Sequence, residues 1–442
     1  MRLMILRPHC GKAGFLILLL ALGWVVPCVG QDAGDPVDVF RPSTLPDWVE
    51  GRFGEAGDHG ITPFFIYGGT WQGNPVGGLS QSTAYAHETL FGAKFDMEKL
   101  AGLRGSGFQV SGSANAGTNL SRRIGNVFNV SQAYVVPTVL FYELYWSQKF
   151  FGDGLEFRFG RMSSSDWFAS LPAFGLQVQG GIDGNPTSLF LNTNFTSSPN
   201  ATWAAAVKVK PGADVYGAWA IFQATDRIRR IAYHGLDFSI RPDDGILTMG
   251  EFGWEPTLGA AAASTSVGAD GKKTVVPENP GLPGEYKFGG YLSTLPVPYA
   301  RGGEEDVTFG FYALAQQMVW RSSMNPDINL SLWGGVTYSP QYYAAPMPWM
   351  GMGGAIFQGL IPGRLQDQFL CTWLIGGFGP AFSPLPEQSG GRPSAETVFD
   401  FSYIINLTDN VFIQPDIQYV IRPNGTSTPP ALVLGLQFGV HF

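Results

Sequence analysis

The sequence predicts an all-β fold, a transmembrane antiparallel β-barrel of about 16 strands, and three observations support it. Apolar residues alternate with small or polar residues along most of the chain. The alternating segments are about 9 to 11 residues long, the length that a tilted membrane strand needs. Aromatic residues gather at the ends of these segments, as the two membrane interfaces require. A soluble β-sandwich, which buries its apolar face between two sheets, is the alternative.

The carboxyl end shows the alternation over two successive segments. In a strand, successive side chains point to opposite faces, so residues of one parity share a face. Residues of one parity in the last segment are all apolar: Leu432, Leu434, Leu436, Phe438, Val440 and Phe442. In the preceding segment, the polar face carries Gln414, Asp416, Gln418 and Arg422. One face is therefore expected to meet lipid and the other to line a lumen.

Up to 18 such segments can be counted along the chain. They begin near residues 64, 85, 105, 127, 138, 154, 189, 202, 213, 234, 246, 286, 308, 328, 366, 396, 411 and 431. The short turns 241–245 and 407–410 are assigned to the inner side of the membrane. The long stretches 255–285, 339–365 and 376–395 are assigned to the outer side. The Met-rich stretch 347–352 is expected to fold inward or to pack on neighbouring loops.

Composition and charge exclude several classes of protein. Charged residues make up 14% of the chain and aromatic residues another 14%, a mixture too apolar for a disordered chain. The formal net charge is −8, which argues against nucleic acid as a partner because that ligand needs a basic surface.

The amino end carries an export signal by its pattern, and this divides the chain into three parts. Arg2, Arg7 and Lys12 precede a short apolar run that ends at Pro27, as in a secretory signal peptide. We expect residues 1–30 to be the signal, 31–60 a periplasmic lead-in and 61–442 the barrel. A retained anchor helix and a lipoprotein acylated at Cys28 are alternatives, and the second is disfavoured by the preceding proline.

Motifs for enzymatic chemistry are missing from the sequence. The four histidines after the signal, His59, His87, His234 and His441, show no metal-ligand spacing. Nucleophile-elbow and phosphate-loop patterns are also missing. We therefore expect no enzymatic activity, no metal and no cofactor.

One region combines charges of both signs with aromatic rings. Its candidate residues for substrate binding and pore lining are Glu143, Glu156, Arg158, Arg161, Asp166 and Trp167. Carboxylate and guanidinium groups hydrogen-bond hydroxyls, and an aromatic ring offers a face to the apolar side of a sugar. The alternative is that these are ordinary solvated lumen charges that pair with one another. Asp416, on the lumen parity of its segment, is a further candidate.

A series of motifs resembles the carbohydrate-selective porin family (OprB-like). The motifs, in order, are Phe95–Leu103, Ile124–Asn126, Glu143–Gln148, Phe157–Arg161, Tyr286–Tyr291, Gly359–Arg364 with Asp367, and Ile413–Pro423. This resemblance implies a sixteen-stranded barrel with an inward-folded loop that narrows the channel. It also implies pore-lining roles for Glu143, Arg158, Arg161 and Arg364.

These expectations combine into a functional prediction. The chain is expected to be an outer-membrane porin that admits small sugars such as glucose by diffusion, with a weak sugar site at its constriction. Its expected partners are small sugars, the lipid and lipopolysaccharide of the outer membrane, and the barrel-assembly machinery through Phe442. For the oligomeric state, the sequence is compatible with a monomer and with a homotrimer. The alternatives are a general or anion-preferring porin, and a closed structural or adhesin barrel.

Overall fold

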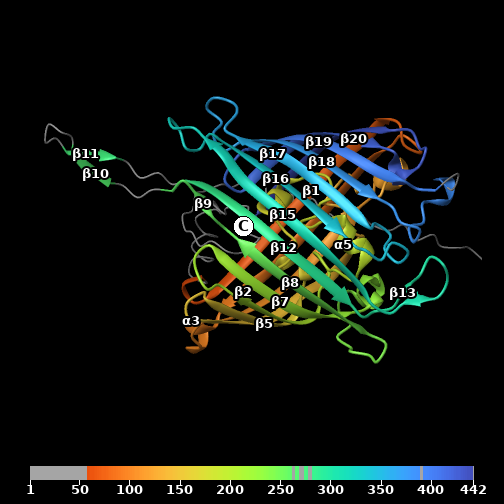
Figure 1. Ribbon diagram of the computed structural model, residues 1–442, viewed down its shortest axis with the longest axis horizontal. Coiled ribbons are helices and arrows are strands. Elements are labelled where there is room, and N and C mark those ends of the chain that lie inside the picture. The colour runs from red at the N-terminus through yellow and green to blue at the C-terminus, as the bar shows by residue number, and fades with distance from the viewer. Residues whose placement is uncertain (1–56, 261–263, 268–272, 277–280, 389–391, 442) are drawn as a thin grey trace, which may run out of the picture.

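Sixteen antiparallel strands form a closed barrel within the described part of the chain (Figure 1). The computed structural model describes residues 57–260, 264–267, 273–276, 281–388 and 392–441. Each strand pairs with its sequence neighbours in the ring, and β1 closes the ring by pairing with β21 in the register Trp71 to Leu436. The predicted fold class is confirmed. The expected signal peptide and most of the lead-in lie outside the described residues.

The barrel strands follow one another around the ring in chain order. They are β1 (Ile61–Val76), β2 (Thr83–Asp96), β3 (Ser106–Gly117), β4 (Thr138–Phe150), β5 (Leu155–Met162), β6 (Thr202–Val209), β7 (Val215–Ala224), β8 (Gly245–Trp254), β12 (Leu282–Ser293), β15 (Thr308–Arg321), β16 (Asn329–Tyr338), β17 (Trp349–Gln358), β18 (Gln368–Gly377), β19 (Ala395–Asn406), β20 (Val411–Ile421) and β21 (Ala431–His441).

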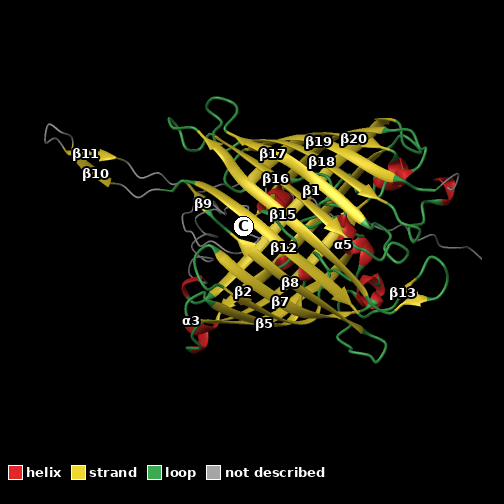
Figure 2. Cartoon of the chain, in the orientation of Figure 1, coloured by secondary structure: helices red, strands yellow, loops and turns green. Residues whose placement is uncertain are grey.

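Short elements occupy the connections between the barrel strands (Figure 2). The short strands are β9 (Thr257–Leu258), which pairs with β12, and the two hairpins β10 (Ser264–Val267) with β11 (Lys273–Val276) and β13 (Val297–Pro298) with β14 (Glu304–Glu305). The α-helices are α3 (Met97–Ala101), α4 (Ser121–Ile124) and α5 (Thr187–Asn192). The 3-10 helices are η2 (Ser164–Asp166), η3 (Pro172–Leu176), η4 (Asp226–Arg229), η5 (Ile231–Tyr233), η6 (Pro386–Gln388) and η7 (Pro423–Gly425).

The alternation read from the sequence gives the two faces of the barrel wall. On β20, Ile417 and Tyr419 are 50% and 44% exposed on the outside, while Gln418 and Val420 are fully buried on the inside. A strand with one apolar outward face and one inward face of mixed polarity is what a membrane barrel needs. Among the described residues, none of the helices is both long and apolar enough to cross a membrane.

The two ends of the barrel carry different connections. The first strand begins and the last strand ends at one end, which we call the inner end, and most connections there are short. The long segments 118–137, 163–201 and 225–244 leave from the other end, the outer end. This division follows the usual pattern of short periplasmic turns and long extracellular loops.

Two assignments of turns to membrane sides are wrong. Residues 241–245 complete the 225–244 connection at the outer end, and only 407–410 lies at the inner end. The 255–281 connection lies at the inner end although it is long, and its hairpin β10–β11 projects from the end opposite to β13 (Figure 1). Loop length alone therefore does not predict the end of the barrel at which a connection lies, because one inner-end connection contains a hairpin of its own.

The outer-end segments 118–137 and 163–201 turn into the barrel, and we call them the short and the long inward loop. Phe128, Phe174 and Ile182 are fully buried in the interior. The long inward loop reaches several walls: Gln414 on β20 donates to the Leu176 carbonyl at 2.9 Å, and Ala173 N donates to Gln316 on β15 at 2.9 Å. Segments expected as strands near 127 and 189 belong to these loops, because their apolar side chains fill the interior.

The alternating segment 234–240 is not a strand of the barrel but a strap across the outside of β4 to β7. Its backbone carbonyls accept hydrogen bonds from outward side chains: Trp203 Nε1 donates to Phe238 O at 2.9 Å and Gln223 Nε2 donates to Ser239 O at 2.8 Å. Leu236 and Ile240 remain 59% and 72% exposed. The prediction of a barrel strand near 234 is therefore wrong, although the segment is extended and its successive side chains point to opposite sides.

The Met-rich stretch is largely part of a barrel strand, so the loop predicted at 339–365 is wrong. The connection is 339–348, and β17 follows it with Met350 and Met352 buried on the inside. Glycines obscured this strand in the sequence, because glycine is uncommon in strands. Gly354 is required there, since a Cβ would lie 2.8 Å from the ring of Trp333.

Candidate functional site

Five of the eight candidate residues meet on the inner surface of β4 and β5 and the start of the long inward loop. Arg158 on β5 pairs with Glu156 at 2.6 Å between Nε and Oε1. Its guanidinium carbon lies 5.1 Å from the centre of the Tyr145 ring and 5.0 Å from that of Trp167. Both charged side chains keep about one seventh of their surface exposed (15% and 14%), so they meet the aqueous lumen.

A chain of hydrogen bonds joins Arg158 to the other two candidates. Arg158 Nη1 donates to the Tyr145 hydroxyl at 3.4 Å, and this hydroxyl donates to Gln109 at 3.0 Å. Gln109 donates to Glu143 at 2.7 Å, and Glu143 hydrogen-bonds Asp166. Glu143 also accepts from the backbone of Ser163 at 3.3 Å. We call Glu143, Glu156, Arg158, Asp166 and Trp167 the lumen cluster.

Two lysines that sequence reasoning missed extend this charged wall. Lys208 on β6 lies 4.9 Å from the Trp167 ring centre and 5.1 Å from that of Tyr216. Lys287 on β12 pairs with Glu285 at 2.6 Å. The register of β5 and β6, which the structure gives, places Lys208 opposite Glu156. Cation–π contacts of this kind fix ring and charge together.

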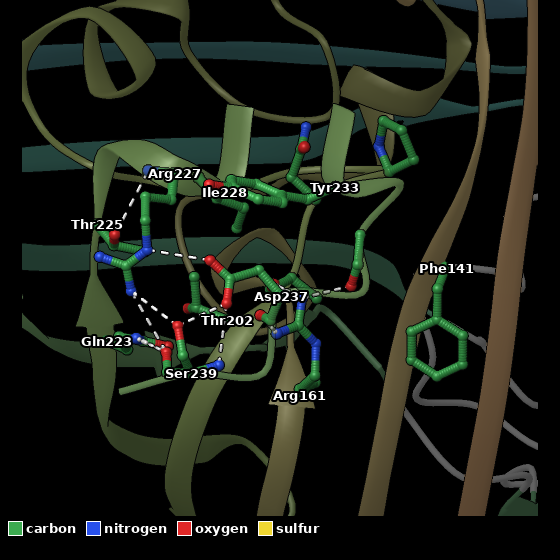
Figure 3. Close-up of a pocket in the computed structure, with 14 residues that line it drawn as sticks. Phe141, Arg161, Thr202, Gln223, Thr225, Arg227, Ile228, Tyr233, Asp237 and Ser239 are labelled. Atoms are coloured by element: carbon green, nitrogen blue, oxygen red, sulfur yellow. Dashed lines mark hydrogen bonds and ion pairs between the residues drawn. The ribbon is translucent and has the colours of Figure 1, made fainter. Parts of the chain in front are cut away.

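Arg161 points away from the lumen, although the sequence placed it with the cluster. Figure 3 shows it among pocket residues that include Asp237 and Ser239. It shares the outward parity of Phe157 and Phe159, which are 45% and 63% exposed. Its guanidinium donates to the carbonyl oxygens of Ala201, Gly235 and Asp237 at 2.8, 3.1 and 2.8 Å. Arg161 therefore ties the end of the long inward loop to the strap.

Asp416 lies on another part of the inner wall, beneath the short inward loop. It accepts from Gln418 at 2.8 Å and from Gln72 at 3.5 Å. The same two amides donate to Val130 O at 2.8 and 2.6 Å. The carboxylate thus orients side chains that hold the short inward loop, away from the lumen cluster.

Arg364 lies in the inner-end turn between β17 and β18, where it pairs with Asp367 at 2.7 Å. This pairing raises the pKa of the guanidinium, since the hydrogen bonds that Arg364 donates to Asp367 favour the charged form. We expect Arg364→Ala to leave ion preference unchanged, measured as the reversal potential across a salt gradient. A shift of the reversal potential would contradict this placement and return Arg364 to the pore lining.

One carboxyl of the long inward loop, that of Asp183, has a pKa above its usual range. Burial, reinforced by the nearby Glu88 carboxylate, raises the pKa of Asp183 to about 8. Glu88 itself accepts from the Ser198 hydroxyl at 2.7 Å. No three or more His, Cys, Asp and Glu side chains in the described ranges are grouped to hold a metal ion.

A closed barrel of sixteen strands with inward loops and a charged, aromatic lumen wall defines a porin, a channel rather than an enzyme. Residues 80–442 match the family described as carbohydrate-selective porin, OprB family. The chain belongs to this family, which, with the barrel fold, implies the outer membrane.

The relatives agree with this assignment. Porin B of Pseudomonas aeruginosa is 24% identical over 483 residues, which cover 99% of this chain and 98% of that protein. The high-pH structure of Pseudomonas putida OprB has a TM-score of 0.78 at 20% identity, over 90% of this chain and 98% of that one. Salmonella typhi OmpF, solved with daunomycin, shares the fold at a TM-score of 0.51 and 8% identity, over 87% of this chain and 99% of that one.

Proposed function

We propose that this porin passes monosaccharides such as glucose into the periplasm by diffusion, with a weak sugar site at the lumen cluster. The observation that carries the proposal is Trp167, whose ring contacts both Arg158 and Lys208. An aromatic face can pack on the apolar side of a pyranose while the neighbouring charges hydrogen-bond its hydroxyls. Asp166, hydrogen-bonded to the buried Glu143, supplies a further acceptor beside them.

Weak binding follows from the need to conduct. A site in a channel must release what it admits, so its affinity is limited. The three inward cations Arg158, Lys208 and Lys287, on β5, β6 and β12, favour, as the alternative, an anion-preferring porin without sugar selectivity.

Single-channel recording in a planar bilayer tests the proposal. Added glucose should reduce the ion current in a saturable way, and maltose should reduce it less because a disaccharide fits the site poorly. An ion current that no added sugar reduces, together with a strong anion preference, would support the alternative and reject the sugar site. A barrel that conducts no ions at all would reject both.

We also propose export through cleavage of residues 1–30, supported by the basic and then apolar pattern of the amino end. Amino-terminal sequencing of the membrane protein should begin near Gln31. The terminal Phe442 is proposed to address the chain to the barrel-assembly machinery, and deleting it should lower the yield of assembled barrel.

A further inference from the structure

Glu251 on β8 is a buried carboxylate of the lumen wall that receives hydrogen bonds from three separate elements. Oε1 accepts from the Tyr216 hydroxyl on β7 at 2.7 Å. Oε2 accepts from the Tyr312 hydroxyl on β15 at 2.7 Å and from the backbone N–H of Ala169 at 2.8 Å. Glu251 is only 5% exposed, so these three donors supply the hydrogen bonds that water would otherwise provide.

Ala169 is a turning point of the long inward loop. It adopts a φ of 56°, a left-handed conformation that non-glycine residues rarely take. The residue is fully buried, and its N–H bonds the wall carboxylate instead of another backbone group. A buried backbone N–H without a partner is costly, so Glu251 stabilises the path of the loop at this residue.

The same carboxylate is linked to both aromatic partners of Lys208, directly to Tyr216 and to Trp167 only through the loop backbone at Ala169. Trp167 precedes Ala169 by two residues, and its ring centre lies 4.9 Å from the Lys208 ammonium. The Tyr216 ring centre lies 5.1 Å from that ammonium, and the Tyr216 hydroxyl is bound to Glu251. One residue therefore fixes the positions of two rings around a single cation.

We infer that Glu251 is a positioning residue for sugar selectivity. It holds the backbone of the long inward loop so that the Trp167 ring contacts Arg158 and Lys208. This inference rests on the proposed sugar site. Glu251 acts through hydrogen bonds to the loop backbone and Tyr216. Its charge also acts on Lys208 and Lys287, so the test must separate hydrogen bonding from charge.

The experiment compares Glu251→Ala and Glu251→Gln by the concentration dependence of glucose block of the ion current. Glu251→Ala should weaken glucose affinity about three- to tenfold, the factor expected for one lost hydrogen bond that holds the ring. Glu251→Gln keeps an amide oxygen that can accept from Ala169, so it should restore affinity to within about twofold of the wild type. Migration in mild detergent with and without heating checks that each barrel has assembled.

Glu285→Gln is the matched control, because it removes a lumen carboxylate that pairs with Lys287. It should shift ion preference and leave glucose affinity unchanged. If Glu285→Gln weakens affinity as much as Glu251→Ala, or if Glu251→Gln behaves like Glu251→Ala, charge explains the effect and the positioning role is overturned. Unchanged affinity in Glu251→Ala also overturns it.

A double variant covers a failure of Glu251→Ala to assemble. Tyr216→Phe with Tyr312→Phe keeps both rings and the carboxylate but removes two of its three donors. It should weaken glucose affinity about threefold, and unchanged affinity would overturn the inference. If the wild type itself shows no glucose block, the proposed sugar site fails instead, so the two failures are distinguishable.

Discussion

Replacing Arg158 by glutamine should weaken glucose block about tenfold and shift the ion preference toward cations, with the barrel still assembled. The guanidinium is the donor that faces the lumen between Glu156, Tyr145 and Trp167. A charged hydrogen-bond donor contributes about 1.5–3 kcal/mol, and about 1.4 kcal/mol is a factor of ten in affinity. Its loss also removes a positive charge from the lumen wall, which makes the lumen more negative. The measurements are the glucose concentration for half block and the reversal potential.

Arg161→Gln is the matched control on the same strand, three residues along and on the opposite face. It should leave the reversal potential and glucose block unchanged, because its guanidinium holds the strap and Ala201 instead of facing the lumen. An effect of Arg161→Gln on ion preference equal to that of Arg158→Gln would show that the assignment of faces on β5 is wrong.

Replacing Arg227 by methionine should release the strap from the barrel wall. Arg227 bonds Asp237 at 3.0 Å and Asp244 at 2.7 Å, and only 7% of its side chain is exposed. Removing one partner from a buried ion pair costs about 3–5 kcal/mol, because it leaves an uncompensated charge. Hydrogen exchange of residues 234–241 in detergent should become faster by about a hundredfold or more.

Arg230→Met is the control for the strap, since Arg230 is exposed and its side chain makes no ion pair in the described part of the chain. It should leave exchange of the strap unchanged. Equal acceleration in both variants would mean that the net charge of the segment, and not the buried pairing, holds the strap in place.

The same contacts give the strap a defined pH dependence. The Ser239 hydroxyl, the Ser239 amide and Arg227 lower the pKa of Asp237 to about 2. Burial alone would raise the pKa of Asp244, but hydrogen bonds from Arg227, Arg241 N and Gln223 hold it well below its usual range. A lowered pKa stabilises the strap above the ordinary carboxyl pKa of about 3.9, and this stabilisation is lost as the pH falls through about 2. The strap should therefore stay in place from pH 4 to 7.

Much of the fold could be predicted from the sequence because the barrel wall follows one local rule, the alternation of inward and outward side chains along each strand. The alternation in β20 predicted the strand and also its faces, with Gln418 inside and Tyr419 outside. The strap obeys the same rule, yet its partners are side chains of Arg161, Trp203 and Gln223 from other strands. Period two alone does not separate a strand from an extended segment that is held in this way.

The sequence predicted only the part of the charged lumen wall whose residues are close together in the chain. Glu143, Glu156, Arg158, Asp166 and Trp167 lie on one hairpin and the loop that follows it, so closeness in sequence indicated closeness in space. Lys208 and Glu251 come from strands whose register the sequence does not give. The strand β17 was missed because its glycines make room for Trp333, a contact between neighbouring strands.

The pairing of β1 with β21, which closes the barrel, has a consequence for biogenesis. The last eleven residues of the sheet, β21, bridge β20 and β1, so the cylinder stays open until the carboxyl end of the polypeptide has been delivered. An unclosed sheet would present bare backbone N–H and C=O groups to hydrocarbon at both margins. Termination of the chain before Ala431 should thus yield an open sheet that lipid cannot accommodate.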